Sequence, residues 1–263
     1  MVVSTIERDK QVLAAANTFA RAARKSTSSV LIDSAKHLCA AVARLRFTPP
    51  VTCVYNPLEY AWAAHEMYLR RYGNGRKRVI FLGMNPGPFG MVQTGIPFGQ
   101  VAAVRDWLQI EAPISGPAKQ HPKRLVTGFA CQRSEISGER LWGLFAQRFG
   151  TADIFFNEHF VVNYCPLAFV EASSRNRTPE KLRQTERETL FAACDEHLRA
   201  AVKALAPEWL IGVGDFAANR ARQVFANGDL RLGRILHPSP ACPASNVDWA
   251  GKATAQLEAL CVC

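Results

Sequence analysis

The sequence predicts an α/β fold: a three-layer α/β/α arrangement in which helices cover both faces of a central, mainly parallel four-stranded sheet. Two patterns predict it. Short apolar runs alternate along the chain with longer segments in which apolar residues recur at helical spacing. The apolar runs also break into glycine, proline or asparagine, as buried strands do where they leave a sheet. Such alternation implies right-handed crossovers and a parallel sheet flanked by helices.

The four expected strands are the apolar runs themselves. The first, Val79-Ile80-Phe81-Leu82, enters a loop that is rich in glycine and proline and extends to Gly99. The second ends in Val161-Val162-Asn163, and the last breaks into His237-Pro238-Ser239-Pro240. Their expected ranges are 78–82, 154–163, 209–214 and 232–236.

Helices are expected between these strands and before them. Segments 6–25 and 30–46 have helical spacing and end in basic residues; Pro49-Pro50 ends the second, and Asn56-Pro57 begins the next. The later helices, one of them capped by Asp215, are expected at 58–71, 101–110, 139–149, 179–206, 215–225 and 249–260. Residues 111–138 are irregular and carry the basic residues Lys119, Lys123 and Arg124. Residues 171–181 are polar, basic and expected to be exposed.

The length of 263 residues fits one large domain or two small ones. We expect a single domain over residues 1–263, with an N-terminal helical extension at about 1–50. The chain is 48% hydrophobic, which is enough for a substantial core. It has no run of about 18 apolar residues, so no membrane partner is expected. Its start, MVVSTIERDK, lacks the apolar stretch of a signal peptide. We therefore expect an intracellular protein, in the cytoplasm or nucleoid of a bacterium or in the nucleus of a eukaryote.

Charge and cysteine usage narrow the class of protein further. The 32 Lys and Arg residues against 22 Asp and Glu give a net charge of +10, which favours a polyanionic partner such as nucleic acid. The eight cysteines form no CxxC pair and the six histidines are isolated, so neither a metal site nor a cofactor is expected. We therefore expect the cysteines to be reduced thiols, as in a protein of a reducing compartment.

Three of the expected strands end in a polar side chain: Asn85 after the first, Asn163 after the second and His237 after the fourth. The carboxyl ends of parallel strands meet at one edge of a sheet, where ligands bind in open α/β folds. Two amides and an imidazole suit recognition of a planar nucleobase, on which Phe98 can stack. Taken singly, each residue also has an ordinary structural role: Asn85 in a turn, Asn163 at a strand end, Phe98 in the core, and His237 bonded to a loop carbonyl.

The motifs GMNPGPFGMVQTGIPFG, VNYCPL and HPSP, in this order, closely resemble the single-strand-selective monofunctional uracil-DNA glycosylases of the uracil-DNA glycosylase superfamily. The stretch SEISGERLWG (134–143) is also similar, and the resemblance covers about residues 55–260. It implies a uracil-DNA glycosylase-like fold and hydrolysis of the N-glycosidic bond of uracil. The implied substrates are single- and double-stranded DNA containing uracil or 5-substituted uracils such as 5-hydroxymethyluracil, with the base flipped into a pocket and an abasic site left behind.

The resemblance also implies residue roles. Asn85 would position the attacking water, and His237 would donate a hydrogen bond to the uracil O2 atom. The remaining base-binding residues would be Gly83, Met84, Gly87, Met91, Phe98 and Asn163. None of the three motifs contains a lysine that could form a Schiff base, which agrees with a monofunctional enzyme.

After HPSP, the family inserts a loop into the duplex, and here the sequence departs from its pattern. The expected wedge is Pro240, Ala241, Cys242, Pro243, Ala244, Ser245 and Asn246. Alanine stands at 241 where the family usually has arginine, so weaker duplex penetration and relatively better activity on single strands are expected. A monomer is expected. The alternatives are a related glycosylase that prefers xanthine or hypoxanthine, a DNA-binding relative without turnover, and a phosphate-binding enzyme, although the Gly-Lys-Ser/Thr of a P-loop is missing.

Overall fold

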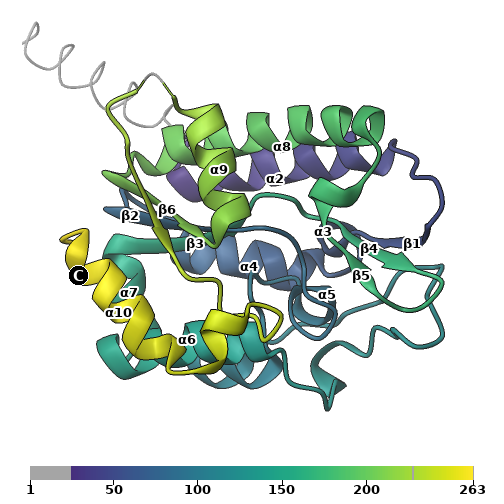
Figure 1. Ribbon diagram of the computed structural model, residues 1–263, viewed down its shortest axis with the longest axis horizontal. Coiled ribbons are helices and arrows are strands. Elements are labelled where there is room, and N and C mark those ends of the chain that lie inside the picture. The colour runs from purple at the N-terminus through teal and green to yellow at the C-terminus, as the bar shows by residue number, and fades with distance from the viewer. Residues whose placement is uncertain (1–24, 227, 263) are drawn as a thin grey trace, which may run out of the picture.

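The computed structural model describes residues 25–226 and 228–262. Its centre is a sheet of four strands in the order β3-β2-β6-β7, all parallel (Figure 1). These strands are β2 (Val79–Gly83), β3 (His159–Asn163), β6 (Trp209–Val213) and β7 (Arg231–Ile235). The predicted fold class is confirmed. The helix predicted at 6–25 lies outside the described residues except for its last residue.

The strand register brings the four carboxyl ends to one edge of the sheet. Gly83 at the end of β2 pairs with Asn163 at the end of β3, and Val213 pairs with Ile235 at the ends of β6 and β7. The loops that carry the polar motifs therefore leave the sheet side by side. This alignment creates the site described below.

Helices cover both faces of the sheet, which explains why the central strands are almost continuously apolar. In Figure 1, α2 (Thr27–Ala43), α8 (Gln184–Leu205) and α9 (Asp215–Val224) lie above the sheet. Below it are α6 (Ile136–Phe149), α7 (Ala152–Glu158) and α10 (Trp249–Ala259). Among the described helices, none is both long enough and apolar enough to cross a bilayer.

The edge strand β3 is covered by α4 (Trp62–Tyr72), which follows the short helix α3 (Pro57–Tyr60). Tyr68 of α4 stacks on Phe160 with ring centroids 5.0 Å apart, and its hydroxyl donates to the Val161 carbonyl at 2.8 Å. The single helix predicted at 58–71 is thus two helices that meet at Ala61. The second N-terminal helix, predicted at 30–46, is α2, and it packs against α8 as part of the main core.

A second sheet was not predicted. Its strands β1 (Val51–Tyr55), β4 (Ala168–Glu171) and β5 (Asn176–Arg177) are antiparallel, in the order β1-β4-β5. The expectation that residues 171–181 are exposed was wrong for β5, because Asn176 and Arg177 pair with β4 and are half-buried. Both residues of β5 are polar, so a prediction based on alternating apolar residues could not detect this strand.

Other differences lie at the ends of elements. The strand predicted at 154–163 is extended only from His159, because Thr151 caps α7 by accepting from the Ile154 N–H at 3.4 Å. The helix predicted from Pro179 begins as a 3₁₀ turn, and α8 starts at Gln184. The helix predicted at 101–110 contains a π-helical turn, Ala103–Trp107, with the short helix α5 (Met91–Thr94) in the loop before it. Gly214, and not Asp215, caps α9.

Candidate active site

A cavity of about 720 Å³ opens at the carboxyl edge of the parallel sheet. Asn85, Asn163 and His237 all line it, and Phe98 forms part of its wall. The other predicted residues that line it are Met84, Gly87, Met91, Ala241, Cys242 and Pro243. Gly83 lies behind this lining, and the remaining predicted loop residues Pro240, Ala244, Ser245 and Asn246 lie outside it. The volume is within the range of small-molecule sites, which is enough for a nucleobase and its sugar.

Asn85 is held by the segment that follows β3. Its Nδ2 atom donates to the carbonyl of Leu167 at 3.2 Å, so the Oδ1 atom lies on the opposite side of the amide. The β3 segment is joined to the Asn85 loop by two backbone hydrogen bonds, Tyr164 N–H to Gly83 O at 3.0 Å and Cys165 N–H to Met84 O at 2.9 Å. The amide is consequently a fixed acceptor that can orient a water molecule.

Asn163 ends β3 directly beside Gly83. Its Nδ2 atom donates to the sulfur of Met91 at 3.2 Å. A Cβ atom on Gly83 would lie 2.2 Å from Asn163 Oδ1 and 2.6 Å from Phe98 Cε2. Glycine is therefore needed at position 83 so that the amide and the aromatic ring can approach the strand this closely.

Phe98 has a backbone conformation that is uncommon for a residue with a side chain, with φ of 53°. Its carbonyl accepts from Trp142 Nε1 at 3.1 Å and from the Gln100 N–H at 2.7 Å. A Cβ atom on Gly138 would lie only 2.0 Å from the same carbonyl oxygen. A left-handed backbone at such a residue costs on the order of 1–3 kcal/mol, and these contacts compensate for it. They hold Phe98 so that its ring forms part of the cavity wall.

His237 is held in one tautomer by the loop that follows it. Its Nδ1 atom accepts a hydrogen bond from the Ser239 N–H at 3.0 Å, so the neutral imidazole carries its proton on Nε2. Burial lowers the pKa of His237 to about 4, and the ring is therefore neutral at physiological pH. Behind it, a Cβ atom on Gly214 would lie 2.9 Å from His237 Cβ. The side chain is thus a neutral, fixed hydrogen-bond donor whose ring centroid lies 6.2 Å from that of Phe98.

Glu135 lines the cavity and was not predicted as a site residue. Its Oε2 atom accepts a hydrogen bond from the Phe89 N–H at 3.1 Å, and a Cβ atom on Gly87 would lie 2.4 Å from the same oxygen. Burial raises the pKa of this carboxyl group. The stretch 134–143 resembled the family, but no sequence pattern indicated that Glu135 would accept a hydrogen bond from Phe89, which lies in a loop 46 residues earlier.

The lining of the cavity includes further residues that sequence reasoning missed. Three of them, Asn176, Thr178 and Glu180, come from the segment 171–181 that was expected to be exposed. Three others, Gly214, Asp215 and Phe216, lie at the start of α9. The break after Val213 was visible as a strand end, but no polar motif marked it as part of a site.

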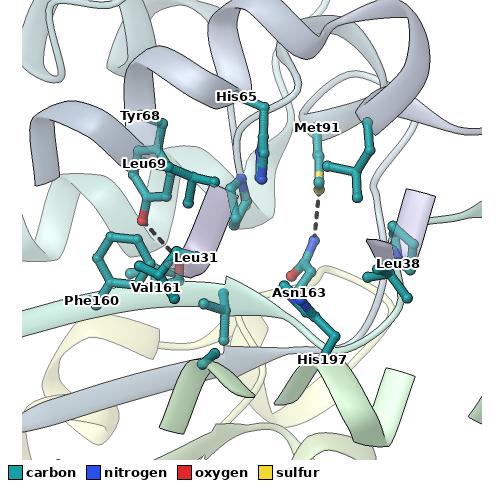
Figure 2. A pocket seen from close by; sticks show the side chains of 15 residues that line it. Leu31, Leu38, His65, Tyr68, Leu69, Met91, Phe160, Val161, Asn163 and His197 are labelled. Atoms are coloured by element: carbon teal, nitrogen blue, oxygen red, sulfur yellow. Dashed lines mark hydrogen bonds between the residues drawn. The ribbon is translucent and has the colours of Figure 1, made fainter. Parts of the chain in front are cut away.

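A second, much smaller cavity of about 30 Å³ lies behind Met91 and Asn163 (Figure 2). The residues that line it are mostly apolar, but the imidazole rings of His65 and His197 also form part of its wall. Both rings are hydrogen-bonded at Nδ1, to Gly95 O and to Ser34 Oγ, each at 2.8 Å. Burial lowers the pKa of each to about 4. These are neutral packing histidines, and the space is large enough only for water.

The comparisons with known proteins agree with this geometry. The family model for the uracil DNA glycosylase superfamily matches residues 70–258. A Mus musculus protein named single-strand selective monofunctional uracil DNA glycosylase is 43% identical over 238 residues, which cover 90% of this chain and 85% of its own length. A Bos taurus protein of the same name is 46% identical over 219 residues, covering 82% of this chain and 80% of its own length.

The crystal structure of Pedobacter heparinus SMUG2 is similar with a TM-score of 0.64, covering 90% of this chain and 99% of its own length. At 20% sequence identity, this likeness supports the fold alone. The family-model match and the two mammalian relatives together show that this chain belongs to the uracil DNA glycosylase superfamily, in the family of single-strand selective monofunctional uracil DNA glycosylases.

Proposed function

We propose that this protein is a DNA repair glycosylase that binds a uracil flipped out of DNA and hydrolyses its N-glycosidic bond, leaving an abasic site. One observation carries the proposal: side chains from three separate strand ends, Asn85, Asn163 and His237, line a single cavity together with the aromatic ring of Phe98. A planar ring with hydrogen-bonding edges is the ligand that such a set accommodates. Membership of the family supports the same conclusion.

Recognition of uracil is assigned to Asn163 and Phe98. The Nδ2 atom of Asn163 has two hydrogens, and the contact with Met91 uses one of them, which leaves one to donate to the uracil O4 atom. Its Oδ1 atom accepts from the N3–H group. Cytosine presents an amine and an unprotonated ring nitrogen at these positions, so it leaves the amide unpaired, which costs roughly 1–3 kcal/mol. Phe98 stacks on the base.

The other lining residues set the shape of the base-binding part of the cavity. Gly83 admits Asn163 and Phe98, while Met84, Gly87 and Met91 enclose the base. We assign Gly87 and Met91 to the surroundings of the 5-position. Because the methionine side chain is adaptable, 5-substituted uracils such as 5-hydroxymethyluracil are included in the proposed substrate range.

The chemical step divides between Asn85 and His237. An amide is not a strong base, so Asn85 can position the water near the sugar C1′ atom but cannot deprotonate it efficiently. Bond cleavage must therefore proceed through an oxocarbenium-like sugar and a stabilised uracil anion. His237 supplies that stabilisation: the neutral ring, whose pKa burial lowers to about 4, donates its Nε2–H to O2 as negative charge develops there.

The absence of lyase activity has a simple basis in the cavity lining. Among the described residues that line the cavity, none is a lysine, so no amine there can attack the sugar and form a Schiff base. Water is the nucleophile in this scheme. The enzyme is monofunctional.

The loop from Pro240 to Asn246 is the proposed contact with duplex DNA. Ala241, Pro243, Ala244 and Asn246 are exposed, and Ala241 and Pro243 also line the cavity. A loop of small apolar residues can enter an unstacked step but fills little of the space that the flipped base leaves. We therefore propose activity on both single- and double-stranded DNA with a preference for single strands. Because one chain supplies every proposed site residue, we propose that the enzyme acts as a monomer.

The decisive experiment is a base-release assay with uracil in single- and double-stranded oligonucleotides. Wild-type protein should release uracil, and the double variant Asn85→Ala/His237→Ala should not. An unchanged rate in the double variant would contradict the proposed mechanism. Matched oligonucleotides with 5-hydroxymethyluracil, xanthine or hypoxanthine test base choice: faster release of either purine than of uracil would replace the proposal by a glycosylase of different specificity. Binding without release under single-turnover conditions would indicate a non-catalytic relative.

A further inference from the structure

The basic residues of segment 111–138 have no role in the reaction described above. The structure brings two of them, Arg124 and Arg133, to the ring of Phe89. The guanidinium carbon of Arg133 lies 3.9 Å from the centroid of that ring, and that of Arg124 lies 5.1 Å from it. Phe89 is only two residues after Gly87, which lines the cavity. Two cationic groups are therefore stacked on an aromatic ring beside the site.

Hydrogen bonds hold the backbone of Phe89 and the side chain of Arg124 in place, and only one of them uses a guanidinium nitrogen. The Phe89 N–H donates to Glu135 at 3.1 Å, which fixes the backbone beneath the ring. Arg124 donates through Nε to the carbonyl of Ser174 at 2.9 Å, and its own carbonyl accepts from the Tyr55 hydroxyl at 2.7 Å. Stacking on the ring orients both guanidinium planes, which reduces the entropy lost when they bind a ligand.

No ion pair of the described residues includes this cluster, although the charge of Arg124 acts on the buried carboxyl group of Glu135 and opposes the effect of burial on its pKa. Within the part of the chain that the structure describes, Arg124 and Arg133 appear in none of the ion pairs, and neither do the exposed residues Lys119 and Lys123. Arg133 is exposed and Arg124 is half-buried. By contrast, no side chain of the loop from Pro240 to Asn246 is charged.

We infer that Arg124 and Arg133, stacked on Phe89, form a binding site for the phosphodiester backbone of the DNA strand next to the flipped nucleotide. Planar guanidinium groups match the geometry of phosphate oxygens, and phosphate contacts supply much of the affinity for single strands. The site compensates for the uncharged loop, because it holds the strand through its backbone and does not require a duplex. The inference rests on the proposed function, since it concerns the same substrate.

The test measures binding of single-stranded DNA without base release. Wild-type protein and Arg133→Gln are titrated with an undamaged single-stranded oligonucleotide at several salt concentrations. Arg133→Gln should bind on the order of fivefold more weakly at low salt, as expected for loss of one exposed charge contact. The slope of log Kd against log salt should also decrease by about 0.7, which corresponds to one phosphate contact on a single strand.

Two further variants make the result specific. Arg148→Gln is the matched control, because Arg148 is also exposed but lies in the last turn of α6, and it should leave affinity and slope unchanged. Arg133→Lys retains the charge but not the planar group, so it should keep the salt slope while losing part of the affinity. Inhibition by free uracil, which reports the base-binding part of the cavity, should be the same in all of these proteins.

An Arg133→Gln protein that binds with wild-type affinity and slope would overturn the inference. So would a loss that Arg148→Gln shares, because that would indicate a general effect of net charge. Failure of the proposed function is recognised separately: wild-type protein would then release no uracil, whereas the undamaged oligonucleotide would still show whether the arginines bind a DNA backbone.

Discussion

The backbone N–H of Ser239 donates a 3.0 Å hydrogen bond to Nδ1 of His237, and this bond decides which nitrogen of the neutral ring carries the proton. With Nδ1 occupied as an acceptor, the neutral ring must carry its proton on Nε2. The serine of the HPSP motif therefore acts through its main chain. A hydrogen-bond donor that is already oriented needs no rearrangement when charge develops on the base, which is the condition for effective electrostatic catalysis.

Replacing His237 by alanine should lower the single-turnover rate of uracil release by about 10²–10³, the usual effect of removing one such donor. Affinity for uracil-containing DNA should change much less, because the base contacts proposed for Asn163 do not involve His237. The measurement is single-turnover base release beside equilibrium binding. A variant that loses affinity but not rate would mean that His237 binds the ground state instead.

Gly83→Ala should abolish recognition of uracil. The added Cβ atom would lie 2.2 Å from Asn163 Oδ1 and 2.6 Å from the Phe98 ring, so both groups must move. Gly143→Ala is the control, because a Cβ atom there meets nothing within 4 Å. It lies within α6, where alanine should stabilise the fold by about 0.5–1 kcal/mol. Measured kcat/KM should decrease sharply for the first variant and stay constant for the second.

Ala241→Arg should increase activity on duplex DNA relative to single strands. The longer, charged side chain can fill the space left by the flipped base and contact the duplex, which alanine cannot. Ala244→Arg, an exposed change of the same charge in the same loop, separates this effect from a general gain in electrostatic attraction. The ratio of duplex to single-strand kcat/KM is the quantity to compare, and an equal ratio in all three proteins would remove the argument from position 241.

Stability should decrease as the pH falls from about 6.5 to about 4. Burial lowers the pKa of His65, His159, His197 and His237 from 6.5 to about 4 in the folded protein. Within this range the unfolded chain binds protons that the folded chain does not, so lowering the pH favours unfolding. The midpoint of urea unfolding should be clearly lower at pH 5 than at pH 7.

A variant that lacks one of the buried histidines provides the control for this pH dependence. His65→Gln removes one of the four groups whose pKa burial lowers, so its unfolding midpoint should differ less between the two pH values than that of the wild type. Equal midpoints at pH 5 and pH 7 in the wild type would mean that the four histidines are not held neutral. Protonation of His237 at Nδ1 would break the hydrogen bond from the Ser239 N–H that orients the ring, so base release should also decrease at the acid end of the range.

The sequence by itself determined the class of fold and the positions of the main polar motifs. Apolar runs and their breaks are local features, and they were enough to indicate four parallel strands with Asn85, Asn163 and His237 at or just beyond their carboxyl ends. The motif order also indicated the family, which the comparisons confirmed.

Only the tertiary structure decided which residues meet. The strand β5 and the bracing residue Glu135 depend on partners far away in the chain, and no local pattern encodes them. The left-handed conformation of Phe98 is likewise imposed by contacts with Trp142 and Gly138. Periodicity specifies which side of a segment is buried, whereas the register of strands and the packing of loops specify what it is buried against. For this reason the sequence indicated most residues of the candidate site, but not its geometry.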